Sequence, residues 1–261
     1  MTYKIKKVTY DIPKLKSSEL KGAIFGTLLG DSKIERNGKV FSSKQISLDL
    51  IQFKYSILNN HFQEVKLQTT PPHHDGKWNH QRLFEVRVKE IYFHKLFPRF
   101  YDDKRKYLSI KHLEGLTDLG LALWFADDGC TSLIGKNKGK ITNRRVMFCS
   151  ECYTEEEHDI MIRFFKIKYG YTMSKPVRGS KKTKKFRLQF SVKDAQNFIL
   201  KVGPYFMKYF PSLSYKLDMG YDTYRNNHMN TVSEEYKEFF NECVKTHPDF
   251  IDRLDEINCS R

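Results

Sequence analysis

The sequence contains no long hydrophobic run. Its longest clearly apolar stretch is the nine residues from Gly22 to Gly30, whereas a helix needs roughly 20 to cross a bilayer. The N-terminal segment is mixed in charge and lacks the central apolar part of an export signal. We therefore expect an intracellular protein, in the cytoplasm, the nucleoid or an organelle, with no membrane partner.

Cysteine is scarce as well. The five cysteines are an odd number in a chain without a visible export signal, which predicts reduced thiols in a reducing compartment. Cys149 and Cys152 form a CxxC pair, but a structural zinc site needs a second pair of ligands, and none lies nearby in the sequence. Structural zinc is therefore disfavoured.

Acidic residues are the minority charge. Against 31 Asp and Glu stand 46 Lys and Arg, a formal net charge of +15. Residues 232–261 contain eight acidic and four basic residues, a net charge of -4, which leaves +19 on the preceding 231. Such an excess predicts a polyanionic partner, bound by the body of the chain and not by its last thirty residues. With 20 Phe and 15 Tyr, the chain also has ample material for a packed core.

Two apolar runs about a hundred residues apart introduce a repeat. They are GAIFGTLLGDS, from Gly22 to Ser32, and LGLALWFADDG, from Leu119 to Gly129. Alternating and helical periodicities predict the same order after each run, so that each half reads αββαββα. The predicted elements are strands at 39–48, 64–70 and 82–90 with helices at 49–62 and 91–101, then strands at 130–135, 144–150, 171–179 and 185–192 with helices at 154–170 and 194–210. Thr154 and Glu157 form a capping-box pattern at the start of one of these helices.

Three glycines at four-residue spacing mark the first run. In a helix, Gly22, Gly26 and Gly30 share one face, and each costs about 1 kcal/mol relative to alanine. Such a stripe allows the backbone of another helix to come close. We expect the partner to be the helix of the second run, through Gly120, Ala122 and Ala126.

Both runs end on an aspartate. A carboxylate at a helix C-terminus faces the negative end of the helix dipole, and two carboxylates brought together also repel each other. A hard divalent cation such as Mg²⁺ would stabilise Asp31 and Asp128 in this arrangement. Beside a nucleic-acid backbone, such a site suits phosphodiester hydrolysis.

At these residues the chain resembles LAGLIDADG homing endonucleases of the single-chain, two-motif kind. IFGTLLGDS and LALWFADDG stand where the nine-residue family motif would, and the repeated order of elements extends to about Tyr221. The first copy departs by ending in Ser32 in place of glycine, and the second has Leu123 in place of the inner glycine. Neither departure affects the aspartate that binds metal in the family.

The resemblance implies an α+β fold of two αββαββα repeats in pseudo-twofold arrangement, with saddle-shaped antiparallel sheets and helices packed behind. We expect an N-terminal extension at 1–18, the two repeats at 19–112 and 113–225, and an acidic tail at 226–261. The implied activity is site-specific cleavage of double-stranded DNA at a long asymmetric site, by a monomer that is intron-encoded. Mg²⁺ is the expected cofactor, and Mn²⁺ or Ca²⁺ could occupy its site.

The resemblance also assigns residues to the site. The implied metal site consists of Asp31 and Asp128 as the ligands, together with Gly30 and Asp127. Asp127 is expected either to support the ligands or simply to end its helix. The family tends to place a lysine near each site, for which Lys216 in the second half and Lys106 in the first are the best candidates. Either lysine could instead be a surface residue that contacts phosphate.

The strands carry the residues expected to bind DNA, because a β-ribbon can enter the major groove and read base edges with basic and amide side chains. The candidates, which include basic loop residues expected to contact phosphates, are Lys44, Gln45, Gln68, Arg82, Arg87, Lys89, Lys138, Lys140, Arg144, Arg145, Arg178, Lys181, Lys182, Arg187 and Gln189.

Three other interpretations remain open. The segment PPHHDGKWNH contains His73, His74, Asn79 and His80, but a His-Asn-His nuclease needs its last histidine on a helix, and here a strand pattern follows. The fold could also serve an intron RNA maturase, or a DNA-binding regulator without catalysis. Retention of Asp31 and Asp128 argues against a role in binding alone.

Overall fold

The computed structural model describes residues 10, 12, 14–35, 38–74, 79–80, 82–102, 105–137, 140–178, 184–217 and 233–246. Its contacts divide the chain into two compact units, residues 1–108 with 115–127 and residues 109–114 with 128–261. Among the described residues, no helix combines the length and the apolar character needed to cross a bilayer.

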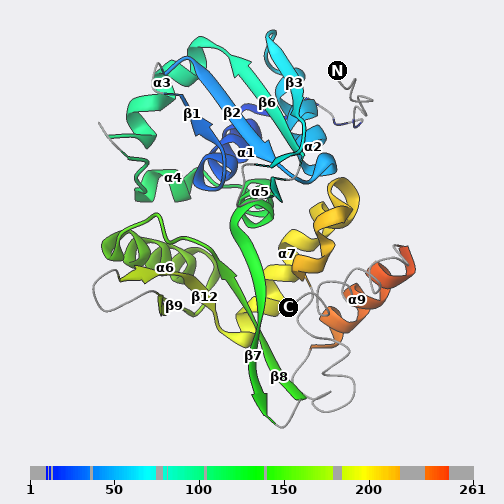
Figure 1. Cartoon of the computed structure of the whole chain (residues 1–261). Helices are drawn as coiled ribbons and strands as arrows, with labels where there is room; N and C mark the ends of the chain where they lie inside the picture. Colours follow the sequence, from blue (N-terminus) through cyan, green and yellow to red (C-terminus); the bar gives the residue numbers. More distant parts are fainter. Residues whose placement is uncertain are drawn as a thin grey trace. The chain divides into compact units, whose positions relative to one another are not determined.

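The first unit contains a four-stranded antiparallel sheet in the order β1-β2-β6-β3. In Figure 1 its strands run from blue to cyan, with the helices of the repeat alongside them. The elements are α1 (Ser17–Leu29), β1 (Lys33–Ile34), β2 (Val40–Gln45), α2 (Leu48–Asn59), β3 (Val65–Thr70), β6 (Leu83–Lys89) and α3 (Ile91–Phe100).

The second unit repeats this topology with a sheet in the order β7-β8-β12-β9. The predicted double αββαββα order is therefore confirmed. The elements are α4 (Ile110–Glu114), α5 (Asp118–Asp128), which runs from the first unit into the second, β7 (Gly129–Asn137), β8 (Lys140–Phe148), α6 (Glu155–Tyr169), β9 (Met173–Ser174), β12 (Leu188–Phe190), α7 (Val192–Tyr209), the 3-10 helix η1 (Pro211–Leu217) and α9 (Glu234–Thr246).

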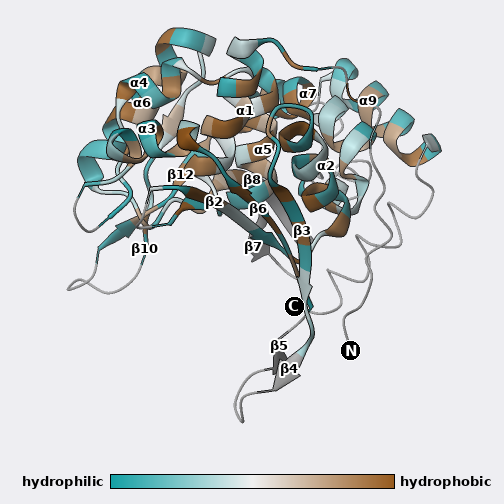
Figure 2. Cartoon of the chain, turned by 90° about the horizontal axis from the view of Figure 1, so that it is seen from above, coloured by the Kyte–Doolittle hydropathy of each residue, from teal (hydrophilic) through white to brown (hydrophobic). Residues whose placement is uncertain are grey.

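Each sheet buries one face beneath its helices. Phe41 of β2 stacks on Phe93 of α3, with ring centroids 5.1 Å apart, and Phe190 of β12 stacks on Phe198 of α7 at 4.5 Å. Hydrophobic and hydrophilic residues alternate along the strands, as the brown and teal bands of Figure 2 show. This alternation follows from the two-residue period of a strand, and it leaves the other face of each sheet polar.

Two short hairpins extend the repeats. β4 (His73–His74) pairs with β5 (Asn79–His80), and β10 (Val177–Arg178) pairs with β11 (Lys185–Phe186). His80 lies in a strand, so the geometry of a His-Asn-His nuclease, which places this residue on a helix, is not present.

The capping box expected at Thr154 is present. The Thr154 hydroxyl accepts from the Glu157 amide, and the Glu157 side chain accepts from the Thr154 amide. The helix ends at Gly170, whose φ of 73° is the left-handed conformation that favours glycine. Local signals alone therefore account for both ends of α6.

The segment expected as an acidic tail contains a packed helix. In α9 the buried Tyr236 donates its hydroxyl to the Leu217 carbonyl at 2.9 Å, and Phe239 lies against Gly203 of α7. Acidic residues at the start of α9 suit the positive end of its helix dipole, so composition alone did not distinguish this helix from a solvated tail.

The expected contact between the two motif helices is confirmed. A Cβ on Gly26 would lie 1.9 Å from the Gly120 carbonyl oxygen, and one on Gly120 would lie 2.3 Å from the Gly22 carbonyl oxygen. The other close neighbours of the α1 glycines are Thr117 and Asp127. The contact face of α5 therefore runs through Thr117, Gly120 and Asp127, and the expectation of Ala122 and Ala126 as the matching stripe was wrong.

We expect Gly26→Ala to lower the free energy of unfolding by about 3 kcal/mol. The new methyl group would meet the backbone of Gly120, which, unlike a side chain, cannot move aside by changing rotamer. Urea denaturation measures the change. Gly170→Ala is the control, since its Cβ meets open space and only the positive φ is strained, at about 1 kcal/mol. Equal losses in the two variants would contradict the close backbone contact.

Candidate active site

Asp31 stands at the end of α1, one residue beyond the cap residue Gly30, and is exposed. Lys106 covers the end of the same helix. Its ammonium donates to the carbonyls of Leu28 at 2.7 Å and Gly30 at 2.6 Å. A cation at a helix C-terminus satisfies carbonyls that have no partner within the helix. The structure therefore places Lys106, the lysine proposed for the first half, at the peptide next to Asp31.

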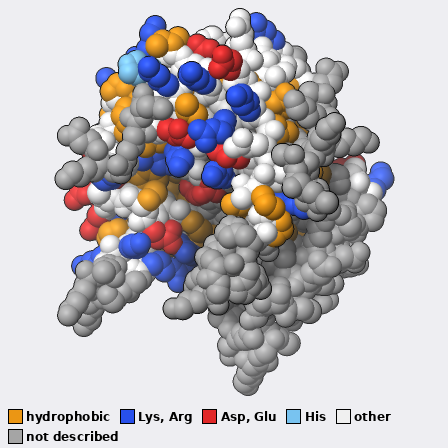
Figure 3. Space-filling view, turned by 45° about the horizontal axis from the view of Figure 1, so that its top comes forward, with side chains coloured by type: hydrophobic (Ala, Val, Ile, Leu, Met, Phe, Trp, Pro, Cys, Tyr) orange, Lys and Arg blue, Asp and Glu red, His pale blue; other side chains and the backbone are white. Residues whose placement is uncertain are grey.

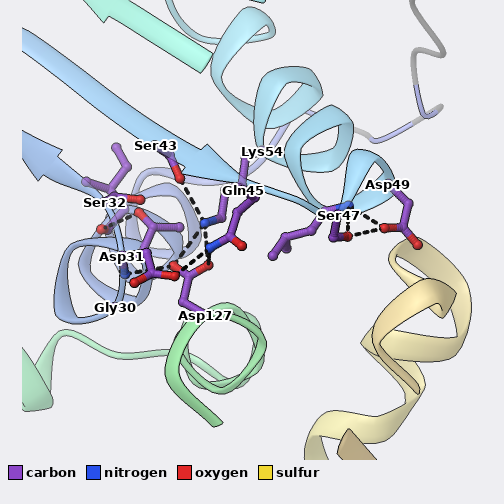
Figure 4. Close-up of polar contacts among 12 residues, drawn as sticks. Gly30, Asp31, Ser32, Ser43, Gln45, Ser47, Asp49, Lys54 and Asp127 are labelled. Carbon is purple, nitrogen blue, oxygen red and sulfur yellow. Dashed lines mark hydrogen bonds and ion pairs between the residues drawn. The ribbon is translucent and has the colours of Figure 1, made fainter. Parts of the chain in front are cut away.

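Asp127 lies beneath Asp31 in the first unit, and its side chain is fully buried. The ammonium of Lys54 binds both of its carboxylate oxygens, at 2.6 and 2.9 Å, and also donates to Ser43 Oγ at 3.0 Å. The two charged side chains are 1% and 0% exposed. Figure 4 shows this buried ion pair beside the end of α1.

Gln45 connects the two aspartates. Its amide nitrogen donates to Asp31 Oδ2 at 2.8 Å and to Asp127 Oδ1 at 3.0 Å, and the Asp31 amide donates to Asp127 Oδ2 at 3.3 Å (Figure 4). Gln45 was expected to read bases together with Lys44. Successive residues of a strand point to opposite faces, however, and Gln45 points to the helix side. In this structure it is a site residue.

Lys54 was missed from the sequence. It lies in α2 between Phe53 and Tyr55, and all three are buried. A lysine inside an apolar helix segment is a usable signal, because an unpaired buried ammonium is costly. The sequence did not identify its partner, since Asp127 is far away along the chain.

The second unit places different groups near the second motif. Asp128 ends α5, and its carbonyl accepts from the Cys149 amide at 2.8 Å. The thiols of Cys130 and Cys149 lie 3.5 Å apart. Lys216 is buried in η1, which packs on β7, and its charge acts on the Cys130 thiol. The structure thus brings the second predicted lysine into the neighbourhood of the residues that follow Asp128.

These elements match a known family. The model of the LAGLIDADG DNA endonuclease family matches residues 21–198, which include both motif helices and most of both sheets. The chain belongs to the LAGLIDADG DNA endonuclease family.

One solved structure shares the fold of this chain, and the curated relatives that match are RecA proteins. The homing endonuclease I-WcaI bound to its DNA recognition sequence superposes with a TM-score of 0.62 and 22% identity, over 77% of this chain and 87% of that one, which shows the shared fold. RecA of Mycolicibacterium flavescens is 26% identical over 206 residues, which are 74% of this chain, and RecA of Mycobacterium shimoidei is 25% identical over 217 residues, or 78%. The chain spans 45% and 48% of these relatives, less than half of their length.

The first LAGLIDADG repeat presents a polar sheet face centred on Glu85. Lys44 and Gln68 stand opposite Glu85 on the two neighbouring strands, and Gln68 donates to it at 2.7 Å. Arg87, two residues further along β6, binds Glu85 and Glu35. Basic side chains lie next to acidic ones on the face seen in Figure 3. The acidic groups hold the basic ones in place across the sheet.

The second repeat has a comparable face. Arg187 forms an ion pair with Glu151. Burial lowers the pKa of its guanidinium, but the bond to Glu151 and the nearby thiols outweigh burial, so the pKa is raised. Arg145 Nε and Gln189 Oε1 are buried and have no hydrogen-bond partner within the described part of the chain.

The remaining candidates for DNA contact are distributed as follows. Arg82 precedes β6, Lys89 ends it exposed, and Arg178 is exposed in β10. Lys140 and Arg144 lie in β8, but their side chains are not described, and Lys138, Lys181 and Lys182 lie outside the described residues.

We expect Cys130 to alkylate faster near neutral pH than Cys243. Its pKa is lowered to about 7, first by the hydrogen bond with Cys149 and then by Arg187 and Lys216. A lowered pKa means that the reactive thiolate is already present at neutral pH. Iodoacetamide labelling followed by mass spectrometry, between about pH 6 and pH 9, measures the profile. Cys243 is the internal control, because burial raises its pKa to about 12. Faster labelling of Cys243 than of Cys130 would contradict this arrangement.

Proposed function

We propose that this chain is a homing endonuclease that hydrolyses phosphodiester bonds in both strands of a long DNA site with the help of a divalent cation. The observation that supports it most is the exposed carboxylate of Asp31 at the end of the first motif helix, with the ammonium of Lys106 fixed on the adjoining carbonyl. Metal-assisted hydrolysis needs oxygen ligands that face solvent and a positive charge nearby. Family membership supports the same activity.

The residues fit Mg²⁺, and Mn²⁺ or Ca²⁺ could take the same oxygen ligands. The described residues contain no group of three or more His, Cys, Asp or Glu side chains arranged to hold a metal ion. Mg²⁺ needs no such cluster, since it binds through one or two carboxylates together with waters and substrate phosphates. Each motif aspartate, Asp31 in the first repeat and Asp128 in the second, would be a ligand, and the Gly30 carbonyl retains a lone pair beside its bond from Lys106. When bound, the cation activates water and stabilises the leaving oxygen.

The other site residues have supporting roles in this proposal. Asp127 is buried and bound to Lys54, so it supports Asp31 and does not contact metal. Gln45 orients the Asp31 carboxylate. Lys106 and Lys216 place positive charge near the ends of the two motifs, where charge develops on phosphate during hydrolysis.

Two repeats in one chain suit a duplex, whose two strands run in opposite directions. Each repeat supplies one motif aspartate and one lysine, so we assign one strand to each repeat. A monomer then suffices for a double-strand break, and the differences between the repeats suit an asymmetric target.

Incubation with a plasmid library of random sites in Mg²⁺, followed by sequencing of the cut ends, tests this function. We expect ends on both strands that cluster at one long sequence. Binding without cutting would overturn the proposal in favour of a regulator. Selective binding and splicing of intron RNA, without DNA cleavage, would overturn it in favour of a maturase.

We expect Asp31→Asn and Asp128→Asn to separate binding from cleavage. Each keeps the size of the side chain but weakens metal binding, so cleavage should fall by more than about 100-fold while affinity for the duplex, which depends on the sheets, changes little. Cleavage and gel-shift assays on the selected site measure both quantities. Asp159→Asn, at an exposed surface ion pair with Lys175, is the matched control and should cut normally. Normal cleavage by either motif variant would refute its assignment as a ligand.

A further inference from the structure

The buried ion pair of Lys54 and Asp127 has a position that a purely structural pair would not need. Asp127 accepts the Asp31 amide and shares the Gln45 side chain with the Asp31 carboxylate. Four donor contacts therefore meet on the two oxygens of Asp127, two of them from Lys54. Movement of this carboxylate would displace both the backbone and the side-chain support of Asp31.

Lys54 is what keeps this carboxylate in place. Without the ammonium, the Asp127 side chain, which is 0% exposed at the negative end of α5, would lose its two contacts from Lys54. The carboxylate could then turn away, and such a movement alters the acceptor that the Asp31 amide and Gln45 share.

The second repeat has no lysine at the position in its helix that corresponds to Lys54. Counted from the helix N-caps Ser47 and Thr154, the position of Lys54 in α2 corresponds to Met161 in α6. Met161 is fully buried and apolar. The supporting charge is therefore built into one repeat, although both repeats carry a motif aspartate.

We infer that Lys54 is a positioning residue for the first half-site alone, meaning Asp31 and the residues around it in the first repeat. It acts on Asp31 through Asp127 and Gln45. This inference rests on the proposed endonuclease activity and on the assignment of one strand to each repeat. It predicts that loss of Lys54 slows cleavage of one strand and spares the other.

Lys54→Met tests the inference directly, because methionine is the residue that α6 has at this position. With each strand of the selected site labelled separately in Mg²⁺, we expect the rate constant for one strand to fall at least tenfold. The other should change by less than twofold, and the dissociation constant for DNA in Ca²⁺ should stay within twofold of the wild type. The variant should therefore accumulate DNA nicked in one strand.

A second variant protects the test against misfolding. Lys54→Met with Asp127→Asn leaves no unpaired buried charge, and asparagine has one acceptor oxygen where two are needed for Gln45 and the Asp31 amide. We expect it to fold, by circular dichroism, and to show the same one-strand loss. Lys95→Met, an exposed lysine of α3, is the charge-matched control and should cut both strands normally.

The outcomes separate the two proposals. If the wild type cuts neither strand, the endonuclease proposal itself fails. If the wild type cuts both strands and the folded double variant loses both equally, or loses neither, the positioning role of Lys54 is refuted. A reduced folded fraction alone would lower both rates by the same factor, so a one-strand loss cannot arise from instability.

Discussion

The close contact between α1 and α5 is the constraint on which the first half-site depends. At Gly26 and Gly120 the two backbones meet with no room for a Cβ. The same contact sets Asp127 against Gly30, where a side chain on the glycine would lie 2.5 Å from Asp127 Cβ. The Asp127 carboxylate therefore lies at the C-terminal end of α1, where the helix dipole disfavours a negative charge. The glycine stripe is therefore as much a requirement of the site as of the core.

That placement explains why a lysine lies inside an otherwise apolar helix. Removing the ammonium of a buried pair leaves an uncompensated charge, which typically costs about 3–5 kcal/mol. Lys54 thus has a structural role as well as an effect on Asp31, and both follow from its ion pair with the buried Asp127. The contribution of the pair to net stability is smaller, because both groups lose their hydration on burial. Its value for the site lies in fixing the direction of the Asp127 oxygens.

Much of the fold follows from patterns visible in the sequence. The two apolar runs, the alternating strands and the Thr154 capping box predicted both repeats and their order. The motif helices were paired correctly, but the contact face of α5 was misassigned because two alanines resemble a small-residue stripe. Gln45 could have been placed from the two-residue period of β2, which excludes Lys44 and Gln45 from the same face. The partner of Lys54 could not have been predicted from the sequence, since it depends on how α2 and α5 pack in three dimensions.

The central claim is that Asp31 binds the cation, whereas Asp127 binds Lys54 and does not contact the cation. A crystal structure of the protein with its DNA site and Ca²⁺ would test it most directly. The account predicts an ion about 2.3–2.6 Å from a carboxylate oxygen of Asp31, with Asp127 still bound to the Lys54 ammonium. An ion bound to Asp127, with Lys54 displaced, would contradict it, and so would a site in which Asp31 contacts no ion at all.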